Sequence, residues 1–182
     1  MARVPHVERD ELDAEGQEIY DRIRKDRNIP NVPLQFRALL HSPKAAGYLT
    51  SMGAQLRFQS AMPENLKELA IILIAREMNS AIEWTGHAVL AAKAGVSAGS
   101  IEAVRARKAP DGLTGDEQVI TRFVHELLRN KAVPDAVYGA VHKLLGTKGA
   151  VDLTLTCSYY AGLCLAQIAL KLEMEPGRVS TL

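Results

Sequence analysis

The chain has 182 residues, about the length of one globular domain, and 47% of them are apolar. A chain of this size can bury a full hydrophobic core, and its ordinary composition excludes intrinsic disorder. The 22 basic and 21 acidic residues nearly cancel, which argues against a nucleic-acid-binding protein.

Helix start and stop signals occur along the whole chain. Ser42-Pro43 is typical of an N-cap followed by proline in the first helical position, and Thr114-Gly-Asp-Glu117 is typical of a capping box. Apolar periodicity and these signals predict helices over residues 12–27, 43–60, 63–78, 80–94, 99–107, 114–129, 134–146 and 149–172. No segment shows the alternation of a strand. We therefore predict an all-α fold, a bundle of eight to nine helices forming a single domain over residues 1–182.

The location of the protein is predicted from three features. The N-terminus has no apolar signal-peptide segment, and the most apolar stretch, residues 153–172, carries enough polar side chains to favour a buried core helix over a membrane span. Cys157 and Cys164 lie two helical turns apart, too far for a disulfide within one helix, and are expected to be core thiols. We expect a cytoplasmic protein without a membrane partner.

Three titratable residues are predicted to face the interior. Glu83 and His87 are four residues apart on one helical face, which continues through apolar residues such as Ala91. On the preceding helix, Glu68 shares its face with Ile72 and other apolar residues. Because buried carboxylates are costly unless paired, we expect the two acids and the histidine to converge within hydrogen-bond reach at a pocket.

Structural interpretations of the same residues remain open. Ser80-Ala-Ile-Glu83 is itself a capping-box pattern, and His87 is also compatible with a satisfied core histidine. Metal binding by the three residues is disfavoured, because only one of them is a histidine. His125-Glu126 resembles the start of a zinc-protease helix, but Arg129 replaces the second histidine, so we expect an exposed charged face there.

The chain resembles the carboxymuconolactone decarboxylase family, which also contains the alkyl hydroperoxidase D-like proteins. The resemblance is carried by Leu66-Lys-Glu-Leu-Ala-Ile-Ile-Leu-Ile-Ala75, Glu83-Trp-Thr-Gly-His87 and Ala91-Ala-Lys-Ala-Gly-Val-Ser97. It extends over about residues 31–172, leaving an N-terminal helix and loop at 1–30. It implies an alkyl hydroperoxidase D-like helical fold and a homo-oligomer, either a trimer or a hexamer.

The peroxidase branch of that family uses Cys-x-x-Cys-x-x-x-His with a glutamate nineteen residues before the histidine. Glu68 and His87 match that spacing, but the two cysteine positions are occupied by Ser80 and Glu83. Peroxide reduction by this route needs a thiolate and a resolving thiol. The resemblance therefore favours the decarboxylase branch, which lacks these cysteines and acts without a cofactor or metal.

The resemblance implies a carboxy-lyase that removes CO2 from a small carboxylated lactone or a related metabolite of aromatic catabolism. His87 would donate a proton or hydrogen bond, Glu83 would orient it and Glu68 would serve as the acid. Candidate substrate-binding residues are Arg37, Arg57 and Trp84. The alternatives are a thiol-dependent alkyl hydroperoxidase of peroxiredoxin type, which the missing cysteines disfavour, and a non-catalytic helical oligomer or small-molecule binder.

Overall fold

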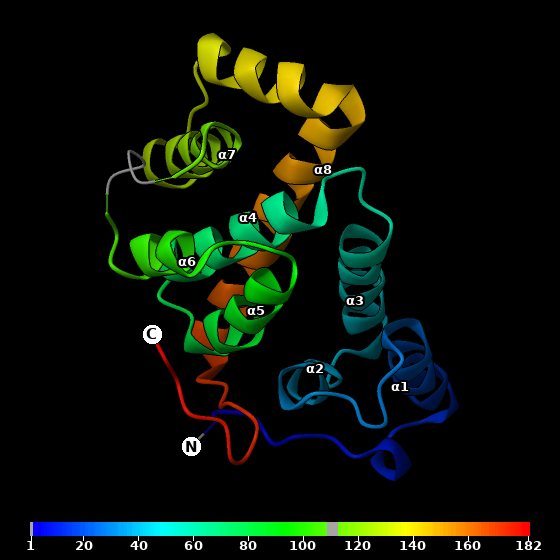
Figure 1. Ribbon diagram of the computed structural model, residues 1–182. Coiled ribbons are helices and arrows are strands. Elements are labelled where there is room, and N and C mark those ends of the chain that lie inside the picture. Colours follow the sequence, from blue (N-terminus) through cyan, green and yellow to red (C-terminus); the bar gives the residue numbers. More distant parts are fainter. Residues whose placement is uncertain (1, 109–112) are drawn as a thin grey trace. The chain divides into compact units, whose positions relative to one another are not determined.

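The computed structural model describes residues 2–108 and 113–182, and this part of the chain is all helical, with eight α-helices and no strand. It divides into two compact units (Figure 1). Unit 1 comprises Met1–Gln59 and Leu165–Arg178, and unit 2 comprises Ser60–Cys164 and Val179–Leu182. The all-α prediction is confirmed, whereas the single domain stays a prediction.

Unit 1 is built on two packed helices, α1 (Ala14–Arg27) and α3 (Pro43–Phe58), with the short helices η1 (Arg9–Glu11) and α2 (Leu34–Leu39) beside them. Asp13 caps α1 by accepting a hydrogen bond from the Gly16 N–H at 2.8 Å. Gly47 permits the close approach of α3 to α1, since a Cβ there would lie 2.6 Å from the Arg22 guanidinium. The bounds of α1 and α3 confirm the helices predicted over residues 12–27 and 43–60. The short helix α2 was not predicted.

Unit 2 is centred on α4 (Glu64–Glu77), which packs against α5 (Ala81–Lys93), α6 (Ala98–Arg105) and α7 (Gly115–His125). Every residue of α4 from Leu66 to Ala75 is buried. A helix that is apolar all round is expected at the centre of a core, and this one is. The charged side chains of Lys67 and Glu68 are nevertheless carried inside with it.

The C-terminal half of the chain departs from the predicted helices at two places. α7 was expected to run to Arg129, but its last turn is a π-helical segment, η3 (Glu126–Asn130). The predicted helices 134–146 and 149–172 form α8 (Asp135–Leu170), which is interrupted at Gly146. Gly146 has φ 67° and ψ 179°, a conformation that favours glycine, so the predicted break is confirmed.

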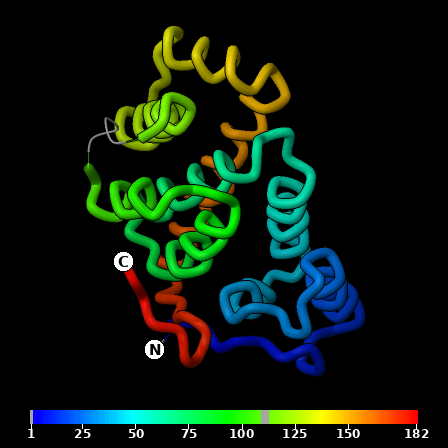
Figure 2. Tube along the Cα trace, viewed as in Figure 1, coloured from blue at the N-terminus to red at the C-terminus, as the bar shows by residue number. Residues whose placement is uncertain are grey.

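The chain terminus returns to unit 2 after leaving α8 (Figure 2). There the indole N–H of Trp84 on α5 donates a hydrogen bond to the Thr181 hydroxyl at 3.1 Å. Trp84 itself is fully buried.

Among the described helices, α8 is long and apolar enough to cross a membrane by length and composition, and 44% of its most apolar window is buried. A core helix of a water-soluble protein passes the same test, so this finding is weak evidence. The location of the protein stays a prediction.

Candidate functional site

Glu68, Glu83 and His87 lie together inside unit 2, whereas the pocket expected beside them stays a prediction. Nδ1 of His87 lies 2.7 Å from a carboxylate oxygen of Glu68, a short hydrogen bond between α5 and α4. Nε2 of the same ring lies 3.6 Å from a carboxylate oxygen of Glu83, beyond hydrogen-bond distance. The imidazole is therefore held between two acids, one directly bonded and one close by.

All three side chains are shielded from solvent. Glu68 is 2% exposed, Glu83 4% and His87 6%. An ionised carboxylate in such a setting is costly unless it is paired, and the imidazole is the group that pairs here with Glu68. The residual exposure of His87 leaves the ring as the most accessible member of the cluster.

The start of α5 fixes the position of Glu83 and His87. Ser80 is the N-cap of the helix, and its hydroxyl accepts a hydrogen bond from the Glu83 N–H at 3.2 Å. Asn79 precedes the cap in a left-handed conformation with φ 51°, which turns the chain from α4 into α5. The cap prediction is correct for Ser80, while the Glu83 carboxylate lies beside His87, one turn further along.

A tyrosine of α8, not predicted as a site residue, completes the surroundings of the histidine. The Tyr160 ring meets the His87 ring edge-to-face, with centroids 5.1 Å apart, and Tyr159 packs edge-to-face on Tyr160 at 4.9 Å. Leu153, Cys157, Tyr160 and Cys164 form one buried stripe of α8 at intervals of three and four residues. This periodicity is the sequence signal that could have placed Tyr160 against the site.

Both cysteines are buried and not joined to each other. Burial raises the pKa of the Cys157 thiol to about 12. The pKa of the Cys164 thiol is also raised to about 12, by burial and by the nearby Glu83 carboxylate, against a smaller opposing effect of a hydrogen bond with Ser80. The thiolate is the reactive form, so both sites disfavour thiol chemistry near neutral pH.

The predicted substrate-binding residues lie in different surroundings. Arg37 belongs to unit 1, where its guanidinium binds the Glu8 carboxylate and donates to the Val7 carbonyl oxygen at 3.2 Å. Arg57, also in unit 1, stacks its guanidinium on Phe58 with 5.1 Å to the ring centroid. Trp84 lies next to Glu83 on α5 as a buried side chain. Substrate contacts of these three residues stay a prediction.

A second polar cluster occurs where α4 meets the end of α7. Arg129 donates two hydrogen bonds to the Glu77 carboxylate, at 2.6 and 2.8 Å, and His125 Nε2 lies 3.7 Å from the same group. The Arg129 guanidinium lowers the pKa of Glu77, and burial lowers the pKa of His125. The expected exposed face is thus wrong for His125, whose side chain is only 18% exposed because it packs towards α4.

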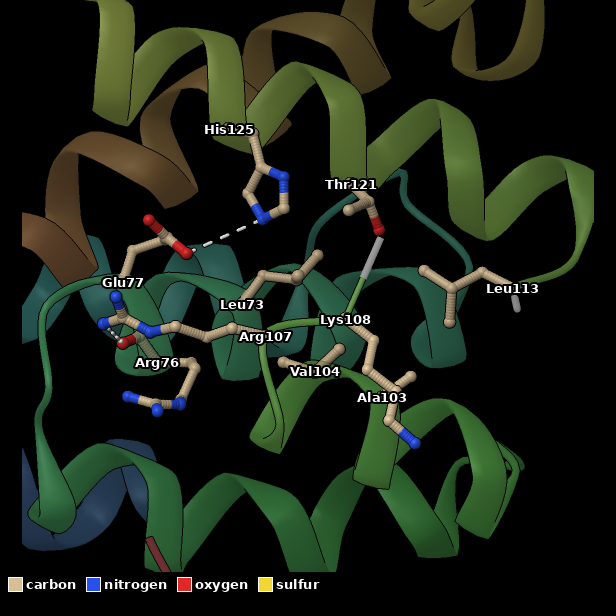
Figure 3. A pocket seen from close by; sticks show the side chains of 10 residues that line it. All are labelled: Leu73, Arg76, Glu77, Ala103, Val104, Arg107, Lys108, Leu113, Thr121 and His125. Carbon is tan, nitrogen blue, oxygen red and sulfur yellow. Dashed lines mark hydrogen bonds and ion pairs between the residues drawn. The ribbon is translucent and has the colours of Figure 1, made fainter. Parts of the chain in front are cut away.

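This second cluster borders a small cavity of about 10 Å³, which is room for one water-sized group (Figure 3). Leu73 and Val104 contribute apolar walls, and Arg76 and Arg107 lie near Glu77. Both guanidiniums donate to the Asn79 side-chain oxygen, at 2.7 and 3.0 Å. The arrangement fastens the ends of α4 and α6 to each other.

Within residues 2–108 and 113–182, no three histidine, cysteine or acidic side chains are placed to hold a metal ion. A scan against models of known protein families found no match, and a search of curated proteins found none either. The chemistry of the Glu68–His87–Glu83 cluster is therefore argued from its geometry.

Proposed function

We propose that the protein is a cofactor-free carboxy-lyase of the carboxymuconolactone decarboxylase type, acting on a small carboxylated lactone. The observation that carries the proposal is the 2.7 Å hydrogen bond between Nδ1 of the buried His87 and a carboxylate oxygen of Glu68, with Nε2 of the same ring not directly bonded to Glu83. A ring held at one nitrogen by a carboxylate is oriented to exchange a proton at the other.

The reaction needs a proton donor and stabilisation of negative charge. When the bond to CO2 breaks, its electron pair stays on the substrate carbon, which is conjugated with the lactone carbonyl. The dienolate then takes up one proton on carbon. His87 Nε2 is the donor in this proposal, either to the developing oxyanion or to carbon, in surroundings that exclude bulk water.

The geometry favours a different division of roles between the acids from the one expected from the sequence. Glu68 makes the short bond to Nδ1, so it is the group that orients the ring. Glu83, 3.6 Å from Nε2, lies on the side of the ring where the substrate would react. It would stabilise the protonated imidazole before proton transfer and repel the departing carboxylate.

The thiol-dependent alternative finds less support in the same region. The family's redox positions hold Ser80 and Glu83, and the two thiols in the chain have a pKa of about 12. The alternative of a non-catalytic binder predicts that the cluster only stabilises the fold. The two interpretations differ in whether a substitution at His87 affects turnover separately from stability.

The test is CO2 release from 4-carboxymuconolactone and from other carboxylated lactones, with the enol-lactone product followed by its ultraviolet absorbance. Glu68→Gln keeps the size of the side chain and is expected to lower kcat about 10²-fold or more. Glu83→Gln is expected to lower kcat as well. Glu102→Gln is the matched control, because Glu102 is exposed and pairs with Arg105 on α6, and it should keep wild-type turnover.

Two results would contradict the proposal. One is the absence of turnover by the folded wild-type protein on every lactone offered. The other is turnover that survives Glu68→Gln unchanged. Peroxide reduction supported by a dithiol, and lost on replacing Cys164, would favour the hydroperoxidase instead.

A further inference from the structure

One face of α8 is left uncovered by the described residues of unit 2. Val151 is 48% exposed and Leu155 41% exposed, and Ser158 and Gly162 are exposed on the same side. These four residues, which we call the α8 seam, follow one another at intervals of four, three and four. That spacing is the repeat of a helix that packs lengthwise against another helix.

The hydroxyl of Ser158 in the α8 seam and that of the neighbouring Thr154 both have hydrogen-bond partners within the helix. The Ser158 hydroxyl donates to the Thr154 carbonyl oxygen at 3.0 Å, and the Thr154 hydroxyl donates to the Ala150 carbonyl oxygen at 2.9 Å. Both hydroxyls are satisfied within their own helix, so covering them costs little desolvation. Residues 153–170 include no charged side chain, so no like charges meet when this part of the helix is covered.

The packing among the described residues of unit 2 does not explain the glycine at position 162. A Cβ at this position would meet no described atom within 4 Å, and the residue is helical. Glycine inside a helix costs roughly 1 kcal/mol relative to alanine. A missing side chain on an exposed seam lets another helix approach its backbone closely, and that approach is a physical reason for glycine there.

We propose that the α8 seam binds the same seam of a second copy of this chain, with the two helices antiparallel about a two-fold axis. With the axis between residues 156 and 157, Val151 lies opposite the partner's Gly162, and Leu155 lies opposite the partner's Ser158. Each large side chain then meets a small one, and each contact occurs twice. A two-fold interface requires this self-complementarity.

A second copy accounts for the seam better than a lipid bilayer does. The opposite side of the same helix, including Cys157 and Tyr160, is buried within unit 2. The helix therefore exposes only one side, whereas a single membrane span exposes apolar side chains to lipid on all sides. Lipid would also give no reason for two large residues to be followed by two small ones along one face. This inference does not rest on the proposed function.

The first test is the mass of the full chain by light scattering after size exclusion. We expect an even multiple of the 19.8-kDa chain mass for the wild type and half that mass for Leu155→Lys. Tyr138→Lys is the matched control, because Tyr138 is 43% exposed on the other half of α8 and should leave the mass unchanged. A monomeric or trimeric wild type, or a Leu155→Lys protein of wild-type mass, overturns the proposal.

Gly162→Leu separates association from folding. The added side chain has room within the chain itself and raises helix propensity, so the melting temperature of the dissociated protein should not fall below that of Leu155→Lys. Its mass should fall by half. Gly139→Leu, also on α8 and also open to a Cβ, should keep the wild-type mass. If both glycine variants keep the wild-type mass, the seam is not an interface.

A cysteine pair tests the orientation. Val151→Cys combined with Gly162→Cys should form an intermolecular disulfide on mild oxidation, and neither single variant should do so. In an antiparallel pair two copies of residue 151 are about 16 Å apart along the helix. Cross-linking by Val151→Cys alone indicates a parallel pair and refutes this register. Flotation of a monomeric wild type with phospholipid vesicles would instead identify lipid as the occupant.

Discussion

The hydrogen bond between Glu68 and His87 predicts a measurable coupling in the free energy of unfolding. The perturbation is a cycle of Glu68→Leu, His87→Leu and the double variant. Leucine is close to glutamate in volume, so Glu68→Leu removes the carboxylate without opening a large cavity. It leaves the buried Nδ1 of His87 without its partner 2.7 Å away.

The expected magnitudes follow from burial. An unsatisfied buried donor costs about 1–3 kcal/mol, so Glu68→Leu should destabilise unit 2 by that amount. His87→Leu strands the Glu68 carboxylate, which costs about 3–5 kcal/mol if it stays ionised, and loses the edge-to-face contact with Tyr160, about 0.5–1.5 kcal/mol. The double variant strands neither group of this bond. The decrease in the free energy of unfolding of the double variant should therefore be smaller than the sum of the decreases in the two single variants, by about 2 kcal/mol.

The assay is urea unfolding followed by tryptophan fluorescence. Trp84 is the chain's one tryptophan, it is fully buried, and it neighbours the cluster on α5, so its emission reports on unit 2. The coupling would be refuted if the decrease in the free energy of unfolding of the double variant equalled the sum of the two single decreases to within about 0.5 kcal/mol. That result would mean that the 2.7 Å contact contributes nothing specific to stability.

Three further predictions concern other parts of the structure. Because Cys157 and Cys164 are buried with a pKa of about 12, neither should react with an aromatic disulfide reagent at pH 8 in the native protein. Both should react after unfolding. Rapid labelling of the native protein would contradict their burial. The Arg129 guanidinium lowers the folded-state pKa of Glu77, so this carboxylate stabilises the fold above its ordinary pKa and loses the effect as the pH falls through the lowered value. Glu77→Gln should therefore lower the free energy of unfolding by up to about 1 kcal/mol at pH 7. On acidification the variant should lose less stability than the wild type. Parallel acid-unfolding curves of the two proteins would argue against the pairing. Thr121 is 2% exposed, and its hydroxyl has no hydrogen-bond partner among the described residues. Thr121→Val should therefore raise the free energy of unfolding by about 1 kcal/mol. A lower melting temperature of this variant would disprove the prediction.

Local signals in the sequence predict much of the helical framework. Pro43, Ser80 and Thr114 mark three helix starts, and each lies where the structure begins a helix. The unbroken apolar run of α4 predicts its burial on all sides. In contrast, α2 has only six residues, too few for periodicity to show, and the π-helical turn after His125 has no distinct residue pattern.

The candidate site is predicted only as far as single helices determine it. The four-residue spacing of Glu83 and His87 places them on one face of α5, and the structure agrees. Which acid bonds directly to the imidazole depends on how α4 is rotated and shifted against α5. Side-chain packing decides that, and it selects Glu68. Contact with Tyr160 depends in the same way on α8, more than 70 residues further along the chain.

The central claim is that the imidazole of His87 transfers the proton in a decarboxylation. It is tested most directly by single-turnover CO2 release from 4-carboxymuconolactone by the wild type and by His87→Gln, both shown to be folded by Trp84 fluorescence. His142→Gln is the matched control, because His142 is exposed on α8, where it contacts the Thr147 hydroxyl and stacks on the Tyr138 ring. The account predicts release by the wild type and by His142→Gln, and a loss of 10²-fold or more, on the order expected for general acid catalysis, in His87→Gln. Equal release by the wild type and His87→Gln would contradict it.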